Sequence, residues 1–343
     1  MEGELWTEVY RIVYEENSNR IRPKGVQFSD ARILEVFLWA VIHDRPTSWA
    51  CRRENWPVQQ RWRDLPCDAT MSVRLRTISV CLLMQAVLDR LHASDHPALA
   101  RVLDSKPLPL GCYSKDQDAD WGWAATAQAR GYKLFCAWGS GVVPDAWTLG
   151  PMNASDSEVG VKLVPQLEAA AYVLGDAGHD SNPLHAACAD CGCQLVAPRK
   201  RPETNLGHRV HEPGRLRSVE MLEWPVLLGT AASPFARELY AMRTQIERTY
   251  GNLCGFGGGL QPLPSWVRTP HRVAMWVAGK LVINALRRCK NAGLAAQIKK
   301  VAEYRERGQT ARLFECGRPA VRASSRPSKF ETGLSIRIIY CCN

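Results

Sequence analysis

Residues 99–106, LARVLDSK, mark the place where the sequence changes character. The run is short and apolar and leads to a carboxylate at Asp104, which predicts a buried strand that leaves its sheet at this residue. A second run of the same kind, AYVLGDAGHD at 171–180, leads to Asp176. Because ligand sites in open α/β sheets lie beyond the carboxyl ends of strands, we expect the two carboxylates to lie close together.

Strand and helix patterns alternate around these two runs. GYKLFCAWGSG (131–141) and VVPDAWTLGPM (142–152) predict two strands joined by a glycine-rich hairpin. Helices are predicted at 156–170, 182–192 and 233–256, the last as one long helix, and a strand is predicted at 193–200. The order is that of a mixed α/β sheet with flanking helices, and it matches the ribonuclease H-like fold.

The first 98 residues have a helical pattern instead. SDARILEVFLWAVIHD (29–44) begins with a Ser/Asp cap, and 68–93 forms a second long helical stretch with Arg74 and Arg76 near its start. Short helices with arginines near one N-terminus suit a helix-turn-helix DNA reader. A plain helical bundle explains the same pattern. We expect an all-α, DNA-binding region at 1–98, followed by an α/β domain at 99–292.

Charge favours a polyanionic partner. The 343 residues carry a formal net charge of +10, and cations that neutralise phosphates release counterions. Residues 293–343 contain ten Lys and Arg against four Asp and Glu, and they form a basic tail that we expect to be partly disordered. A basic insertion near 199–232 carries Arg199, Lys200 and Arg201, which we expect to contact DNA.

Targeting and redox features are ordinary. The N-terminus, MEGELWTE, has no apolar signal core, and the longest apolar run is too short to span a bilayer, so we expect an intracellular protein without membrane contact.

The thirteen cysteines show no repeating frame, which favours reduced thiols. His185, Cys188, Cys191 and Cys193 have the chemistry of zinc ligands, but no second C-x-x-C pair follows, so buried thiols are the preferred interpretation.

A third acidic residue lies in the helical pattern YAMRTQIERTY, 240–250. Tyr240, Arg243 and Glu247 are spaced i, i+3, i+7, so they share one face of an uninterrupted helix. An aromatic, a cation and an anion are an unusual choice for a core-facing stripe. An exposed Arg–Glu pair would have the same spacing and little energetic value.

Three motifs together carry a family resemblance. The spacing of Tyr240, Arg243 and Glu247 resembles the Y-(2)-R-(3)-E-(6)-K signature of DDE transposases from bacterial insertion sequences. DSKPLPLG around Asp104 and GDAGHDS around Asp176 fit the same pattern in the same order. The resemblance covers about residues 99–290.

The resemblance implies a function and a site. Asp104, Asp176 and Glu247 would hold two Mg²⁺ or Mn²⁺ ions and act as the catalytic residues of DNA cleavage and strand transfer at transposon ends. Arg243 and Tyr240 would contact DNA. His179 and Asp180 closely follow Asp176 in the sequence, so we expect them to line the same pocket behind the metal ligands. The protein would work on double-stranded DNA as a homodimer, at the nucleoid of the bacterial cytoplasm. Neutralising either aspartate should raise the melting temperature of the metal-free protein, because like charges repel.

One departure from the signature leaves alternatives open. The terminal Lys of the signature is Cys254 here, and we expect a nearby arginine such as Arg248 or Arg268 to supply the missing cation. Two rivals remain: a metal-dependent nuclease on the same fold without strand transfer, and a decayed or domesticated DNA-binding protein without catalysis.

Overall fold

The computed structural model describes residues 2–306 except 19, 22–24, 62, 93–97, 112, 125, 168–169, 205, 207–209, 224–233 and 256–258. The basic tail from 307 onward and parts of the basic insertion therefore lie outside the described residues.

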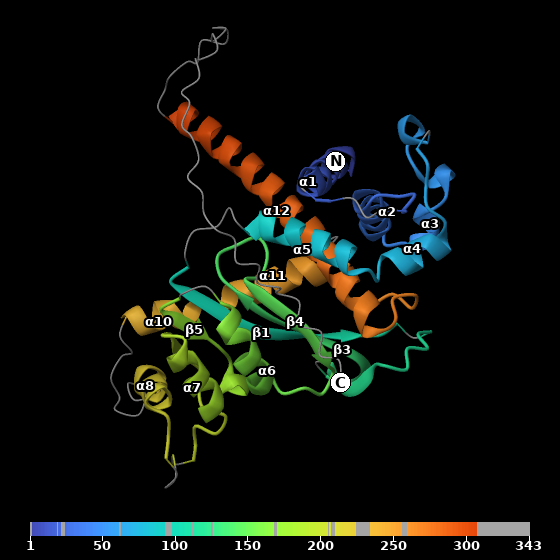
Figure 1. Ribbon diagram of the computed structural model, residues 1–343. Helices are drawn as coiled ribbons and strands as arrows, with labels where there is room; N and C mark the ends of the chain where they lie inside the picture. Colours follow the sequence, from blue (N-terminus) through green and yellow to red (C-terminus); the bar gives the residue numbers. More distant parts are fainter. Residues whose placement is uncertain are drawn as a thin grey trace.

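The N-terminal part is helical, as the sequence predicts (Figure 1). The Ser29 side chain accepts a hydrogen bond from the Arg32 amide at 3.2 Å and caps α2, which confirms the predicted helix start. Nearly every residue of α2 is buried, because the helix packs against α1 and α5. The elements are α1 (Glu2–Ser18), α2 (Asp30–Ile42), α3 (Thr47–Ala50), η1 (Arg53–Asn55), η2 (Val58–Gln60), α4 (Asp68–Arg74) and α5 (Ile78–His92).

The expected helical stretch at 68–93 is broken. Helices α4 and α5 meet at an angle of 74°, and at the break the Arg74 carbonyl accepts hydrogen bonds from the Thr77 amide at 3.0 Å and from Thr77 Oγ1 at 2.7 Å. A side chain that takes a carbonyl in this way competes with the helical hydrogen bond. Arg74 therefore lies at the end of α4, and Arg76 lies in the break.

The sheet has six strands in the order β2-β3-β1-β5-β6, with β4 also paired to β3. Strand β1 pairs antiparallel with β3 and parallel with β5, and β5 pairs parallel with β6. The path β4-β3-β1-β5-β6 is the predicted ribonuclease H-like order, which confirms the fold class. The strands are β1 (Ala100–Pro109), β2 (Asp120–Ala124), β3 (Ala127–Trp138), β4 (Ala146–Pro151), β5 (Tyr172–Leu174) and β6 (Gln194–Val196).

Strand β1 is longer than expected, and β2 was not expected at all. The prediction that the first strand ends at Asp104 is wrong, because β1 continues through two prolines to Pro109. The Leu110 amide donates a hydrogen bond to Arg130 of β3. Because alternate residues of a strand point their backbone nitrogens to opposite edges, the nitrogens of Pro107 and Pro109 face away from β3, where a proline removes no hydrogen bond between the two strands. Strand β2 lacks a buried run, since Trp121 and Trp123 are 61% and 66% exposed, and it forms only by pairing with β3.

Helices cover both faces of the sheet (Figure 1). Helices α6 (Asp156–Leu163) and α7 (Asn182–Asp190) close a core around Leu103, Phe135 and Leu184. On the other face, α11 (Thr244–Cys254) and α12 (Pro270–Glu306) pack over Leu108 and Leu134. This second core continues into α1, α2 and α5, so the helical part and the sheet share one hydrophobic interior. Short 3-10 turns complete the domain: η3 (Val164–Gln166) and η4 (Ala177–His179).

Two further expectations need correction. The long helix at 233–256 is divided into α10 (Pro234–Ala241) and α11, because Thr244 Oγ1 bonds the Ala241 carbonyl at 2.8 Å. Helix α12 passes through residue 292 and ends at Glu306, so the first part of the expected tail is helical. The basic insertion contains its own helix, α8 (Pro213–Leu222).

No single helix among the described residues has the length and apolar composition of a membrane span. The pair α4 and α5 reaches them only when its two bent helices are taken together.

Candidate active site

Asp104 and Asp176 lie in matching positions relative to two adjacent strands, Asp104 within β1 and Asp176 just after β5. Val102 of β1 pairs with Leu174 of β5, and each aspartate follows two residues later. The parallel pairing ends at these residues, so both carboxylates stand where β1 and β5 separate. Asp104 lies inside β1 rather than at its end, yet its relation to Asp176 is the one expected from the sequence.

The two carboxylates have different surroundings. Burial raises the pKa of Asp104, and the negative charge of Asp176 raises it further. His179 Nδ1 lies 2.8 Å from Asp176 Oδ1, and the Gly178 amide donates to the same oxygen at 2.8 Å. The hydrogen bond from His179 lowers the pKa of Asp176 to about 2. The first proton on this pair therefore goes to Asp104.

Two tyrosines hold the backbone beside the aspartates. The buried Tyr250 hydroxyl of α11 donates to the Asp104 carbonyl at 3.1 Å. The Tyr240 hydroxyl of α10 donates to the Gly175 carbonyl at 3.3 Å. Both helices are thus fixed to the strands that carry the acids.

Arg243 is the cation of this site. Its guanidinium lies 5.8 Å from the centre of the Tyr240 ring and 3.6 Å from the Glu247 carboxylate. Its positive charge also lowers the pKa of both Asp104 and Asp176, although less than other groups do. Tyr240, Arg243 and Glu247 do not share one helix, because Arg243 caps α11 after the break. The expected continuous helical face is therefore wrong, but Arg243 still links Glu247 to the aspartates.

The residues present partly fit a divalent cation. Mg²⁺ and Mn²⁺ prefer carboxylate oxygens, and Asp104 and Asp176 offer them from two neighbouring strands. Glu247 is 61% exposed on its side chain and is engaged by Arg243. Over the described ranges, no three His, Cys, Asp or Glu side chains are grouped to hold a metal ion. In this structure Glu247 contacts Arg243 and is not grouped with the two aspartates.

The two residues expected behind the site face different ways. His179 is buried and contacts Asp176. Asp180 turns instead to Arg215, whose Nε and Nη2 donate to its two oxygens at 2.6 and 2.7 Å.

The arginines of the helical part also differ. Arg74 is 12% exposed on its side chain, pairs with Asp30 at 2.5 Å and donates to the Phe28 carbonyl. It can reach a DNA phosphate only by breaking these contacts, whereas Arg76 is exposed. Beyond β6, Lys200 and Arg201 are exposed, but Arg199 is buried and pairs with Glu223.

The remaining ligand types do not form a second centre. Cys188 is buried and its neighbour Cys191 is exposed, and no metal-holding group includes them among the residues that can be described. The expectation of buried thiols holds for Cys188, whereas Cys193 is half-buried and Cys191 is exposed.

Cys254 has a cation nearby, but not an expected one. Burial raises the pKa of the Cys254 thiol, and the positive charge of Lys106 opposes this. Arg268 donates to the Ser265 carbonyl, and Arg248 lines a separate cavity with Asn252. Lys106 follows Asp104 by two residues, so both side chains share one sheet face.

Three residues at or near the site were not identified from the sequence: Tyr250, Lys106 and Arg215. The apolar spacing of Ile246, Tyr250 and Leu253 is a usable signal, because it turns this face of α11 toward the sheet. Arg215 is contributed by the basic insertion, and its ion pair with Asp180 has no local sequence signature.

Fold and site together define a ribonuclease H-like protein with an acidic pair where its two central parallel strands separate. The family model for the transposase DDE domain matches residues 95–278, more than half of the chain. The chain belongs to the DDE transposase family.

Other comparisons add little to this assignment. Among solved structures, the cryo-EM structure of a piggyBac transposase synaptic complex with hairpin DNA is similar, with a TM-score of 0.37 and 11% identity over 82% of this chain and 71% of that chain. A comparison with curated proteins gave no match.

Proposed function

We propose that this transposase cuts and joins double-stranded DNA at the ends of a bacterial insertion sequence, with Asp104, Asp176 and Glu247 as its catalytic carboxylates. One observation carries the proposal: Asp104 and Asp176 each follow by two residues a paired position of the adjacent parallel strands β1 and β5, and the charge of Arg243, which contacts Glu247, acts on both.

Each group has a task in this proposal. Bound divalent ions would activate a water or a DNA 3′-hydroxyl and stabilise the leaving oxygen. Asp104 and Asp176 would hold the ions, and Glu247 would complete the ligand set once released by Arg243. His179 orients Asp176 through its hydrogen bond and favours its charged form. Tyr240 and Tyr250 fix the backbone, which matters because phosphoryl transfer depends on exact positioning.

Arg243 changes partner during the reaction in this proposal. While Glu247 is unbound, the guanidinium neutralises part of the acidic cluster. With divalent ions held by the carboxylates, Arg243 would be free to bind a phosphate of the DNA, since a guanidinium pairs well with phosphate oxygens. The protein would act as a homodimer on its two DNA ends, at the nucleoid.

The direct test is end cleavage by the full-length chain with Mg²⁺ and its own flanking DNA. Asp104→Asn and Asp176→Asn should abolish cleavage and retain DNA binding. Asp190→Asn is the matched control, since Asp190 is an exposed acid on α7, and it should cut like the wild type. Wild-type rates in either active-site variant would rule out the assignment.

A second candidate function is DNA binding without catalysis. It is favoured by the absence, within the described residues, of a third acid grouped with the two aspartates. Specific end binding with no cut product in Mg²⁺ or Mn²⁺ would establish it. Cut ends that are never joined to a target would instead indicate a nuclease.

A further inference from the structure

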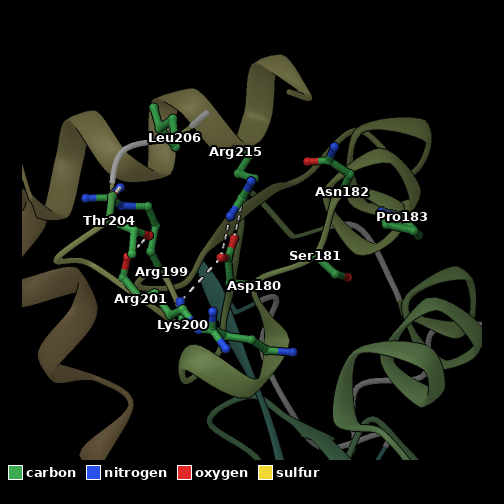
Figure 2. Close-up of a pocket in the computed structure, with 10 residues that line it drawn as sticks. All are labelled: Asp180, Ser181, Asn182, Pro183, Arg199, Lys200, Arg201, Thr204, Leu206 and Arg215. Carbon is green, nitrogen blue, oxygen red and sulfur yellow. Dashed lines mark hydrogen bonds and ion pairs between the residues drawn. The ribbon is translucent and has the colours of Figure 1, made fainter. Parts of the chain in front are cut away.

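A basic cavity of about 520 Å³ lies at the carboxyl end of β6, one strand away from Asp176 (Figure 2). Its wall contains one carboxylate, Asp180, and four cations: Arg199, Lys200, Arg201 and Arg215. Asp180 directly follows His179, which contacts Asp176. The cavity and the acidic pair are therefore connected through one short turn, η4.

Helix α8 builds one side of the cavity by docking along β6. Gln194 donates to the Gly214 carbonyl at 2.7 Å. Ser218 Oγ accepts from the Ala197 amide and donates to the Ala197 carbonyl, both at 2.9 Å. The basic insertion is thus fixed to the sheet edge where it is described.

Arg199 shapes the loop that carries the exposed cations. Its Nε donates to Glu223 at 2.5 Å, its Nη1 to the Thr204 carbonyl at 2.7 Å and its Nη2 to the Pro202 carbonyl at 2.9 Å. The side chain is 9% exposed. Arg199 is therefore a positioning residue, and its charge is neutralised by Glu223.

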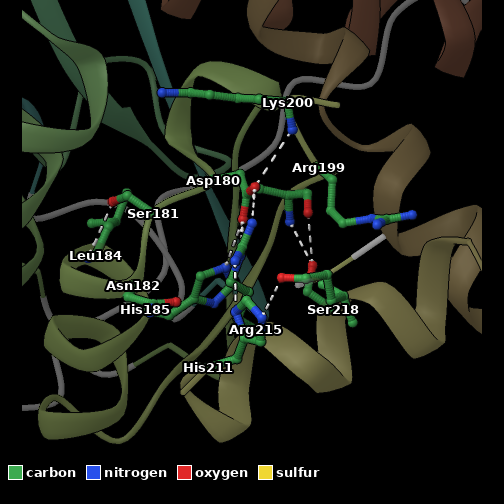
Figure 3. A network of polar contacts seen from close by, with 12 residues as sticks. Asp180, Ser181, Asn182, Leu184, His185, Arg199, Lys200, His211, Arg215 and Ser218 are labelled. Carbon is green, nitrogen blue, oxygen red and sulfur yellow. Dashed lines mark hydrogen bonds and ion pairs between the residues drawn. The ribbon is translucent and has the colours of Figure 1, made fainter. Parts of the chain in front are cut away.

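Arg215 is held as firmly, within the polar network around Asp180 (Figure 3). Besides its two bonds to Asp180, its Nη1 donates to His211 Nδ1 at 2.8 Å, while His211 Nε2 donates to the Leu206 carbonyl at 2.7 Å. Burial works against ionisation of Asp180, but His185 and Arg215 outweigh it and hold the pKa of Asp180 below its usual range. The wall is thus preformed.

Lys200 and Arg201 remain as uncompensated charges. Both are exposed, and their backbone is fixed by the Lys200 amide, which donates to Asp180, and by the Arg201 carbonyl, which accepts from Thr204. Within the described part of the chain, neither side chain forms an ion pair. Two free cations at a preformed cavity favour an anionic ligand, and the volume exceeds that of one phosphate.

We propose that this cavity binds the sugar–phosphate backbone of the DNA beside the acidic pair, with Lys200 and Arg201 as its phosphate contacts. This inference rests on the proposed function and deepens it. Contacts to phosphate set the register of a duplex without reading its sequence. The cavity would thus fix where the scissile phosphate stands relative to Asp104 and Asp176.

The test compares two double variants, each of which loses two positive charges. Lys200→Ala/Arg201→Ala is compared with Lys162→Ala/Arg217→Ala, which removes the same charge from exposed positions on α6 and α8 outside the cavity. Binding of a labelled duplex is followed by fluorescence anisotropy in EDTA at several salt concentrations. The slope of log K against log salt should fall by about 2 in the first variant, close to 0.9 per lost phosphate contact, and by less than half of that in the second.

Equal slopes in the two variants, or a wild-type slope in Lys200→Ala/Arg201→Ala, would overturn the proposal. Circular dichroism checks that both variants are folded. Free anions are tested by competition with inorganic phosphate and a nucleoside triphosphate at constant ionic strength. Neither should displace the duplex. Displacement that disappears in Lys200→Ala/Arg201→Ala would assign the cavity to a small anion and overturn the proposal.

Failure of the proposed function is distinguishable from failure of this inference. Suppose that the salt slopes of the wild type and of Lys200→Ala/Arg201→Ala differ as expected, but the wild type never cuts DNA. This result would contradict the catalytic assignment and support the cavity proposal. A protein that cuts DNA, but whose salt slope is unchanged in Lys200→Ala/Arg201→Ala, would contradict the cavity proposal alone.

Discussion

At the scale of single residues, Asp104 and Asp176 have the same chemistry but opposite electrostatics. Both are partly buried, but desolvation and the charge of Asp176 disfavour the charged form of Asp104, whereas Asp176 accepts two hydrogen bonds. The sequence predicts that they are close, but it cannot distinguish them, because the difference depends on His179 and on how deeply each side chain is buried.

From the sequence we expect neutralisation of either aspartate to raise the melting temperature, whereas these surroundings predict opposite effects for the two aspartates. In EDTA at pH 7, Asp104→Asn should raise the melting temperature by roughly 2 °C, because a penalty on the buried charge is removed. Asp176→Asn should lower it slightly, because the charged form is the one that the fold stabilises. The measurement is thermal unfolding followed by circular dichroism.

The pH dependence follows from the signs of the two pKa shifts. The folded pKa of Asp104 is raised, so its penalty grows as the pH rises through the unfolded value of about 3.9 and the gain in Asp104→Asn should vanish in acid. The folded pKa of Asp176 is lowered to about 2, so its contribution is present above the unfolded value and is lost as the pH falls toward 2. Shifts of the same sign in both variants at pH 7 would contradict this assignment.

Arg243 provides a second prediction at this scale. Its charge acts on all three acids, so Arg243→Gln should tighten Mn²⁺ binding three- to tenfold, about 1 kcal/mol, while end cleavage falls. Isothermal titration without DNA measures the affinity. Arg248→Gln is the control, because Arg248 is exposed on α11 and lines another cavity. Unchanged Mn²⁺ affinity in Arg243→Gln would show that the guanidinium does not compete with the metal.

At the scale of elements, α11 connects the third acid to the sheet. Tyr250→Phe should destabilise the protein by about 1–2 kcal/mol, because a buried hydrogen bond to the Asp104 carbonyl is lost. Tyr240→Phe should cost less, since Tyr240 is only partly buried and its bond is longer. Urea unfolding compares them, and a larger loss in Tyr240→Phe would mean that α10 rather than α11 is the main attachment.

Lys106, whose positive charge acts on Cys254, belongs to β1 and not to α11, the helix that carries Cys254. Lys106→Ala should slow end cleavage by about tenfold, or ~1.4 kcal/mol. The double change Lys106→Ala/Cys254→Lys should restore much of the rate, since the charge returns to the same place from the helix. Cys254→Lys alone should not raise the rate, because it puts two cations together. No rescue in the double variant would separate Lys106 from this role.

Element boundaries were the least predictable part of the fold. The strand order followed from the spacing of apolar runs, and the positions of Asp104 and Asp176 followed from the strands. The breaks before Thr77 and Thr244 did not, because each depends on a hydroxyl that bonds a carbonyl three residues earlier. Strand β2 could not be predicted either, since its tryptophans face solvent and β3 supplies its only ladder within the described sheet.

At the scale of the whole molecule, the basic charge of the C-terminal residues should act on DNA without sequence preference. Residues 307–343 carry seven Lys and Arg against two Asp and Glu. Deleting them should weaken binding to the cognate end and to random DNA about equally and leave the melting temperature unchanged. Competition binding with both duplexes measures this. A selective loss for the cognate end would show that the tail reads bases.

Helix α12 has a consequence for how this protein can be divided. The family match ends at residue 278, only a few turns into a helix that begins at Pro270. Leu281, Val282 and Ala285 lie beyond that border and are buried in the interior shared with α1, α2 and α5. A fragment cut at the border would expose this apolar surface to water at a cost of about 25 cal/mol per Å². The end of the family match is therefore not a boundary of cooperative folding, because the sheet gains part of its stability from helices near the N-terminus.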